Sequence, residues 1–166
     1  MTDGKDLTMP ALILLEDFGG DFNQYLEAVY AIFKRDFVDS KPSWEGKRFA
    51  LKKYPMEFGK EHTFYHITHE GHDETERIPD MRRMERIAFP RFMIDHATHP
   101  TLKVWLKRIN NSDRIHILHE EERFLVVLDI REEIFLLWTA FYIEHNHTLR
   151  KKLNEYDEYI KSKDRT

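Results

Sequence analysis

Four β-rich segments in the second half of the chain place the strongest constraint on its fold. They span residues 102–108, 114–119, 123–129 and 134–142, and only residues 110–113, 120–122 and 131–133 connect them. Connectors this short and turn-like join neighbouring antiparallel strands. The sequence therefore predicts a four-stranded antiparallel meander. The continuous apolar run 134–138 further predicts that the last strand is central and covered on both faces.

Three segments with helical periodicity flank these strands. The first spans residues 21–37, with Asp21 as a candidate N-cap and an apolar stripe of Phe22, Leu26, Val29, Ile32 and Phe33. The second spans 81–89, after Pro79 and Asp80 and before Pro90, which we expect to end it. The third spans 144–161, with a stripe of Leu149, Leu153, Tyr156 and Ile160. The expected fold is α+β, with N-terminal helices packed on a curved sheet and a C-terminal helix.

The organisation of the chain predicts a single domain. Its 166 residues fit one hydrophobic core, and no repeat or long linker divides them. We expect residues 1–60 to form an N-terminal helix and a basic arm, in which residues 47–54 are either a short strand or an arm that ends at Pro55, and residues 61–162 to form the core. The N-terminus lacks the pattern of a secretory leader and no apolar run of about 18 residues occurs, which predicts a cytoplasmic protein without membrane contact.

The chemistry open to this chain is limited by its composition. It has no cysteine, which excludes disulfides, thiolate catalysis and sulfur-based zinc sites. A formal net charge of −4 argues against coating nucleic acid through bulk charge. Residues 77–91 nevertheless hold five arginines against Asp80 and Glu85, a local excess of three positive charges. The sequence therefore predicts one basic face on an acidic body.

A histidine-bearing segment precedes these arginines. Residues 64–69 are aromatic and β-branched, which predicts a strand. Strand alternation would place His66 and His69 on opposite faces, which disfavours a metal site built from His66, His69 and His72. We expect no metal or other cofactor. His66 is instead a candidate general acid or base, and the alternative is a histidine that fills a half-buried strand position.

Arginines and hydroxyl groups supply the other candidate site residues. On a helix, Arg82 and Arg86 share a face and could bind one phosphate, although a solvated charged face remains the alternative. Arg91 adds a cation beside aromatic residues. Thr139 is a polar residue in an apolar strand, and Tyr142 and His147 lie at the junction between this strand and the last helix. Alternation predicts Trp138, Ala140 and Tyr142 on one face of that strand.

The order of these motifs resembles that of a known family. The segments Tyr65-His66-Ile67-Thr68-x-Glu70-Gly71, Pro79-Asp80-x-Arg82-Arg83-x-Glu85-Arg86-Ile87, 121–128, Leu136-Leu137-Trp138-Thr139-Ala140-x-Tyr142 and Lys152-Leu153-x-Glu155-Tyr156 are similar to phage-associated members of the nuclease superfamily of barnase, EndoU, colicin and RelE-like toxins, the BECR fold. The resemblance covers residues 60–160.

This resemblance implies a metal-independent endoribonuclease of prophage or toxin type. In such enzymes a base activates the 2′-hydroxyl, arginines neutralise the phosphate and an acid protonates the leaving oxygen, which yields a 2′,3′-cyclic phosphate. The implied catalytic residues are His66, Arg82, Arg86, Thr139, Tyr142 and His147. The residues expected to bind RNA are Arg83, Arg91, Arg150, Lys151 and Lys152. The implied partners are an RNA substrate, with tRNA as one candidate, and an antitoxin or immunity protein.

Two other hypotheses fit the same residues. A non-catalytic phage module that binds RNA or protein would need the basic face but no proton transfer. A metal hydrolase would use His66, His69 and His72 as ligands.

Overall fold

The first helix packs its apolar side into the centre of the protein. The structure, a computed structural model, describes residues 6–71 and 77–164. After a short 3-10 turn, η1 (Leu15–Phe18), helix α1 (Phe22–Lys34) begins where the Asp21 carboxylate accepts a hydrogen bond from the Gln24 backbone N–H at 3.1 Å. Tyr25, Val29 and Phe33, spaced four residues apart, are fully buried. The predicted helix and its cap are confirmed, and the chain continues as a π-helical turn, η2 (Arg35–Asp39).

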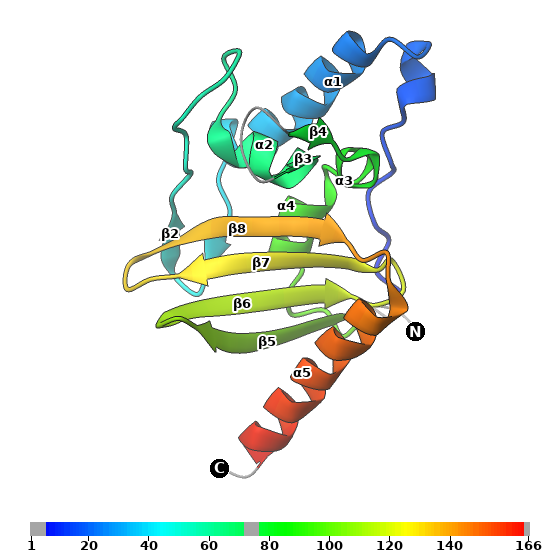
Figure 1. The fold of residues 1–166 in the computed structure, drawn as a ribbon. Coiled ribbons are helices and arrows are strands. Elements are labelled where there is room, and N and C mark those ends of the chain that lie inside the picture. The colour runs from blue at the N-terminus through cyan, green and yellow to red at the C-terminus, as the bar shows by residue number, and fades with distance from the viewer. Residues whose placement is uncertain (1–5, 72–76, 165–166) are drawn as a thin grey trace.

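The main sheet has six strands. Its order is β1 (Ser43–Trp44), β2 (Lys47–Phe49), β8 (Ile134–Tyr142), β7 (Phe124–Ile130), β6 (Ser112–His119) and β5 (Leu102–Ile109). Strands β5 to β8 pair antiparallel with their sequence neighbours, whereas β2 runs parallel to β8. The predicted α+β class is confirmed, but the predicted four-stranded antiparallel sheet is wrong, because residues 43–49 extend it into a mixed sheet (Figure 1).

Short helices line one side of this sheet. Helix α2 (His62–Thr68) leads into a two-stranded sheet of β3 (His69–Glu70) and β4 (Ile78–Pro79), and α3 (Met81–Glu85) and α4 (Phe89–Asp95) follow. The predicted single helix over 81–89 is wrong, since the helix breaks after Glu85. Pro90 does not end a helix but lies in the first turn of α4, where its missing N–H costs no hydrogen bond.

Two apolar clusters hold the fold together, one on each face of the sheet. The inner face, defined by Ile117, Val126 and Leu128, packs against α1 to α4. The outer face, defined by Leu118, Leu125 and Val127, packs against α5 (Asn146–Asp164). Strand β7 is buried on both faces, so β7 and not β8 is the fully covered strand, and Trp138 on β8 is 45% exposed.

The sheet curls so that its two ends approach each other. Trp44 on β1 and Val104 on β5, at opposite ends of the strand order, line one cavity together with residues of α4. Helix α5 runs past the β5 edge in Figure 1. Within the described part of the chain, no helix is both long enough and apolar enough to cross a membrane.

Candidate active site

The histidine segment is a helix, which changes the geometry predicted for His66. Residues 62–68 form α2 and not a strand. Both the hydroxyl and the backbone N–H of Thr63 donate to the Lys52 carbonyl, at 2.9 and 3.2 Å, and the Thr68 hydroxyl donates to the Phe64 carbonyl at 2.7 Å. The remaining turns bury Phe64 and Ile67. This burial outweighs the weak helical preference of the β-branched and aromatic residues.

The helical spacing aligns two imidazoles. His62 and His66 lie four residues apart, so they share the face of α2 that is turned away from the core. Their rings are stacked, with centroids 6.1 Å apart and planes 21° from parallel. In contrast to the strand prediction, the neighbour of His66 is therefore His62 and not Thr68.

A bulge in β8 brings Trp138 to the same place. Thr139 pairs with Val127 and Leu137 pairs with Leu128, so Trp138 has no partner on β7. Such an extra residue breaks the alternation of side chains and redirects one of them. The prediction that Trp138 shares a face with Ala140 and Tyr142 is wrong for this reason. Ala140 and Tyr142 face the inner cluster, while the Trp138 ring lies 6.3 Å from the His66 ring.

Together these elements enclose a cavity of about 250 Å³. Strand β2 pairs with β8 at Ile134 and Phe135, and helices α2 and α3 contact the rest of β8 (Figure 1). No carboxylate is among the described residues that line the cavity, and the cations are Lys52 and Arg131. The full lining is Lys52, His62, Thr63, His66, Arg131, Leu136, Leu137 and Trp138.

The surroundings keep His66 uncharged at neutral pH. His66 is exposed at the surface of α2, but the partial burial of its ring lowers its pKa below the usual 6.5, and positive charge on His62, Arg83, Arg77 and Lys52 lowers it further. Arg83 is held in place by an ion pair with Asp80 at 3.1 Å, and it donates to the His66 backbone carbonyl at 3.3 Å. The cations of the cavity attract an anionic ligand, and the neutral imidazole can accept a proton from a hydroxyl group of that ligand.

Arg82 of α3 and Arg86, the C-cap of this helix, both contact Tyr142. The guanidinium groups of Arg82 and Arg86 each lie 4.8 Å from the centre of the Tyr142 ring. Arg86 also forms an ion pair with Glu85 at 3.2 Å. The prediction that Arg82 and Arg86 share a face is confirmed, and Tyr142 joins them. None of the three lines the cavity, and Arg83 is the α3 arginine that reaches His66.

Other predicted site residues lie elsewhere or serve the fold. Arg91 donates to the Asp36 carbonyl at 2.6 Å and pairs with Asp95 at 3.0 Å, so it ties α4 to η2. His147 is exposed on α5 and stacks on His145. Thr139 is partly exposed on β8 but does not line the cavity. The remaining candidates, Arg150, Lys151 and Lys152, belong to α5 and are likewise outside its lining.

The described histidines of the alternative metal-hydrolase hypothesis have other surroundings. His69 is directed to Thr68, whose hydroxyl lies 2.8 Å from its Nδ1, and burial lowers its pKa to about 4. His72 lies outside the described residues. Among residues 6–71 and 77–164, no three His, Asp or Glu side chains are grouped so as to hold a metal ion.

Three basic residues of the cavity, Lys52, His62 and Arg131, were not identified from the sequence. Lys52 arrives from the segment after β2, and Arg131 from the turn between β7 and β8, so neither is near His66 in the sequence. His62 had a detectable signal, because a His-x-x-x-His spacing aligns two side chains whenever the segment is helical.

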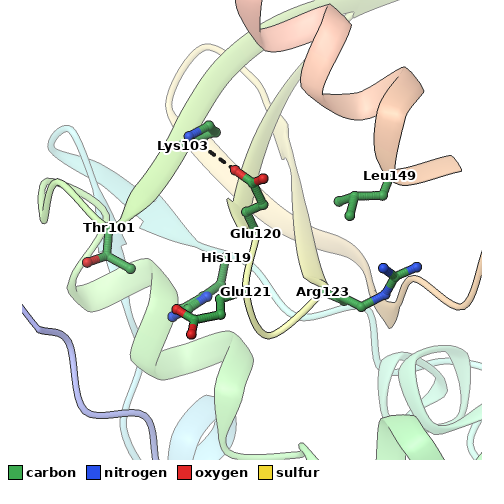
Figure 2. A pocket seen from close by; sticks show the side chains of 7 residues that line it. All are labelled: Thr101, Lys103, His119, Glu120, Glu121, Arg123 and Leu149. Carbon is green, nitrogen blue, oxygen red and sulfur yellow. Dashed lines mark ion pairs between the residues drawn. The ribbon is translucent and has the colours of Figure 1, made fainter. Parts of the chain in front are cut away.

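A second concavity, at the far end of the sheet, differs in charge and use. Figure 2 shows it where β5, β6, β7 and α5 meet, with Lys103 paired to Glu120 at 3.5 Å and Glu121 beside the His119 ring. Arg123 in its wall donates to the backbone carbonyl groups of Ile143 and Glu144. Its carboxylates would repel a polyanion, and its arginine stabilises the entry into α5.

Comparison with known proteins yields no relatives for this chain. No family model matches the sequence, no curated protein matches it, and no solved structure matches the fold.

Proposed function

We propose that this protein is a metal-independent endoribonuclease whose active site is the cavity between α2 and β8. The observation that carries the proposal is the stacked pair of His62 and His66 in a cavity that two cations and no carboxylate line among the described residues. Two imidazoles supply both a base and an acid without a metal ion.

The proposed reaction uses one ring as the base and the other as the acid. Neutral His66 takes the proton of a ribose 2′-hydroxyl, and the resulting 2′-oxygen attacks the adjacent phosphorus. The bond from phosphorus to the 5′-oxygen breaks, and protonated His62 donates its proton to that oxygen. The products are a 2′,3′-cyclic phosphate and a free 5′-hydroxyl. Centroids 6.1 Å apart let the attacking 2′-oxygen and the leaving 5′-oxygen, on opposite sides of one phosphorus, each lie within about 3 Å of a different ring.

The cations provide the electrostatic part of catalysis. Lys52 and Arg131 line the cavity, and Arg83 lies behind His66. Negative charge that develops on the phosphate during attack is stabilised by preorganised cations in a partly dehydrated site. Arg82 and Arg86, stacked on Tyr142, extend this positive surface along α3.

The test is cleavage of single-stranded RNA in the presence of EDTA, with analysis of the product ends for cyclic phosphate. His66→Ala and His62→Ala should each lower the cleavage rate by about 10²- to 10⁴-fold, the usual contribution of a positioned acid or base. The control is His147→Ala, an exposed histidine outside the cavity, which should cleave like the wild type. The acid limb of the rate profile should lie below pH 6.5, because the pKa of His66 is lowered.

Three outcomes contradict the proposal. Cleavage that EDTA abolishes would indicate a metal-dependent reaction. Cleavage that survives both substitutions in α2 would place the chemistry elsewhere. RNA binding without cleavage, weakened by salt, would favour a non-catalytic binding module.

A further inference from the structure

Trp138 presents a large aromatic surface to solvent beside the cavity. It is 45% exposed, whereas Trp105 on the same sheet is 1% exposed. The bulge in β8 produces this exposure, since a regular strand would turn the side chain toward the other face.

The indole is held from behind by an ion-pair network. The guanidinium of Arg114 lies over the Trp138 ring, 3.9 Å from its centre. Arg114 is fixed by Asp129, whose Oδ1 is 3.2 Å from its Nε, and the second oxygen of Asp129 pairs with Arg131 at 3.1 Å. Asp129 itself is only 4% exposed. The ring is therefore held in place with a cation over one face. The residue is still 45% exposed, and the solvent-exposed part of the ring is called its open face.

This arrangement selects the chemistry of a ligand for the open face. A cation over one face draws the π electrons of the indole toward itself, which weakens attraction for a second cation on the opposite face. Lys52 and Arg131 nearby also repel a cationic ligand. The ligand group that stacks on the ring should therefore be planar and uncharged, and the rest of the ligand should be anionic. A nucleobase in a nucleic acid has both properties.

We propose that the open face of Trp138 is a stacking site for one unpaired base of a single-stranded nucleic acid. Trp138 and His66 line one cavity, so a phosphate held between the histidines carries its own nucleoside to the indole. Bases inside a duplex are stacked on their neighbours and cannot offer a face, which restricts the ligand to unpaired regions. This stacking site rests on the proposed function, because that function places a phosphate of the ligand between the two histidines.

Binding of an uncleavable probe tests this site independently of catalysis. The probe is a dye-labelled ten-nucleotide deoxythymidylate, which lacks the attacking 2′-hydroxyl, and its partner is an abasic chain of the same length and charge. Affinity is measured by fluorescence anisotropy at low salt. Trp138→Leu should bind the deoxythymidylate about 5- to 150-fold more weakly, as expected for the loss of one stacked base.

Controls separate stacking from a general loss of structure. Trp138→Phe should keep most of the affinity, because it keeps an aromatic face. Ile160→Ala removes exposed apolar surface from α5, far along the chain, and should leave affinity unchanged. The abasic chain should bind equally to the wild type and to Trp138→Leu. As a second measurement, deoxythymidylate but not the abasic chain should quench the tryptophan emission of the wild type more than that of Trp138→Phe.

The result that overturns the site is equal weakening of both probes by Trp138→Leu, or no weakening of either. Absence of quenching in the wild type, or failure of the wild type to bind either probe, overturns it as well. The two proposals can fail separately. If these binding tests succeed but the protein does not cleave RNA, the stacking site is supported and the nuclease proposal is contradicted. If Trp138→Leu cleaves RNA with an unchanged KM, the nuclease proposal is supported and the stacking site is contradicted.

Discussion

Asp129 is the residue whose loss should cost the most stability outside the apolar clusters. Its buried carboxylate neutralises Arg114, whose side chain is 13% exposed. Asp129→Ala should lower the free energy of unfolding by about 3–5 kcal/mol, because it leaves a largely buried cation without its partner. Arg131→Ala removes the other cation, which is 57% exposed, and should cost at most about 1 kcal/mol. Urea denaturation of both variants measures the difference, and equal costs would contradict this assignment.

His116 should make the protein less stable in acid. It is 3% exposed and stacks on Trp105, and burial, followed by the charge of Lys152, lowers its pKa from 6.5 to about 4. Between pH 6.5 and pH 4 the unfolded chain therefore binds a proton that the folded chain does not, so stability falls as the pH falls through this window. Over this window, one such histidine should lower the free energy of unfolding by on the order of 3 kcal/mol.

Substitution of this histidine isolates its share. His116→Phe keeps the stacked ring but removes the titrating group, so the loss of unfolding free energy between pH 7 and pH 4.5 should be smaller than in the wild type. His69, with its pKa also near 4, keeps part of the dependence in both proteins. An identical pH profile for the two proteins in urea denaturation would refute the role of His116.

At the scale of elements, α1 depends on a cap that the sequence predicted. Asp21→Ala should lower the free energy of unfolding by about 1 kcal/mol, because the Gln24 N–H loses its acceptor. Asn23→Ala, in the same first turn and exposed, should change it by less than about 0.5 kcal/mol. Thermal denaturation of the matched pair checks this, and a larger effect of Asn23→Ala would contradict it.

The elements that sequence patterns predicted well are those whose local preference agrees with their environment. Helix α1 has a cap and an apolar stripe, and strands β5 to β8 have short connectors between apolar runs. Helix α2 has neither advantage. Its helical form depends on Thr63 meeting the Lys52 carbonyl and on Phe64 entering the core, contacts that a local pattern does not contain. The strand prediction failed there for that reason.

The candidate site was predictable only in part, because it combines residues from separate elements. His66 and the arginines of α3 were identified from the sequence. His62 required α2 to be a helix, Trp138 required the bulge in β8, and Lys52 required the chain after β2 to pass beside α2. Each of these depends on tertiary contacts that the sequence alone does not specify.

At the scale of the whole molecule, the two faces of the sheet are covered unequally. Helices α1 to α4 cover the inner face, while α5 is the cover that the described residues provide for the outer cluster. No residue of α5 is fully buried, yet Leu149, Leu153 and Tyr156 pack on that cluster, and Glu155 accepts a hydrogen bond from the Trp105 indole at 3.4 Å. The stability of the outer face should therefore depend on α5 from Leu149 to Tyr159.

Two truncations separate the part of α5 that packs on the outer cluster from its C-terminal end. A chain that ends at His145 lacks the whole of α5 and leaves Trp105, Leu118 and Leu125 open to water. Its free energy of unfolding should fall by on the order of 5 kcal/mol, its tryptophan emission should shift to longer wavelength, and it should bind a hydrophobic dye. A chain that ends at Ile160 keeps every α5 residue of the outer cluster and should match the full-length protein in all three measurements. If the shorter chain also matched it, α5 would not be the cover that stabilises the outer face.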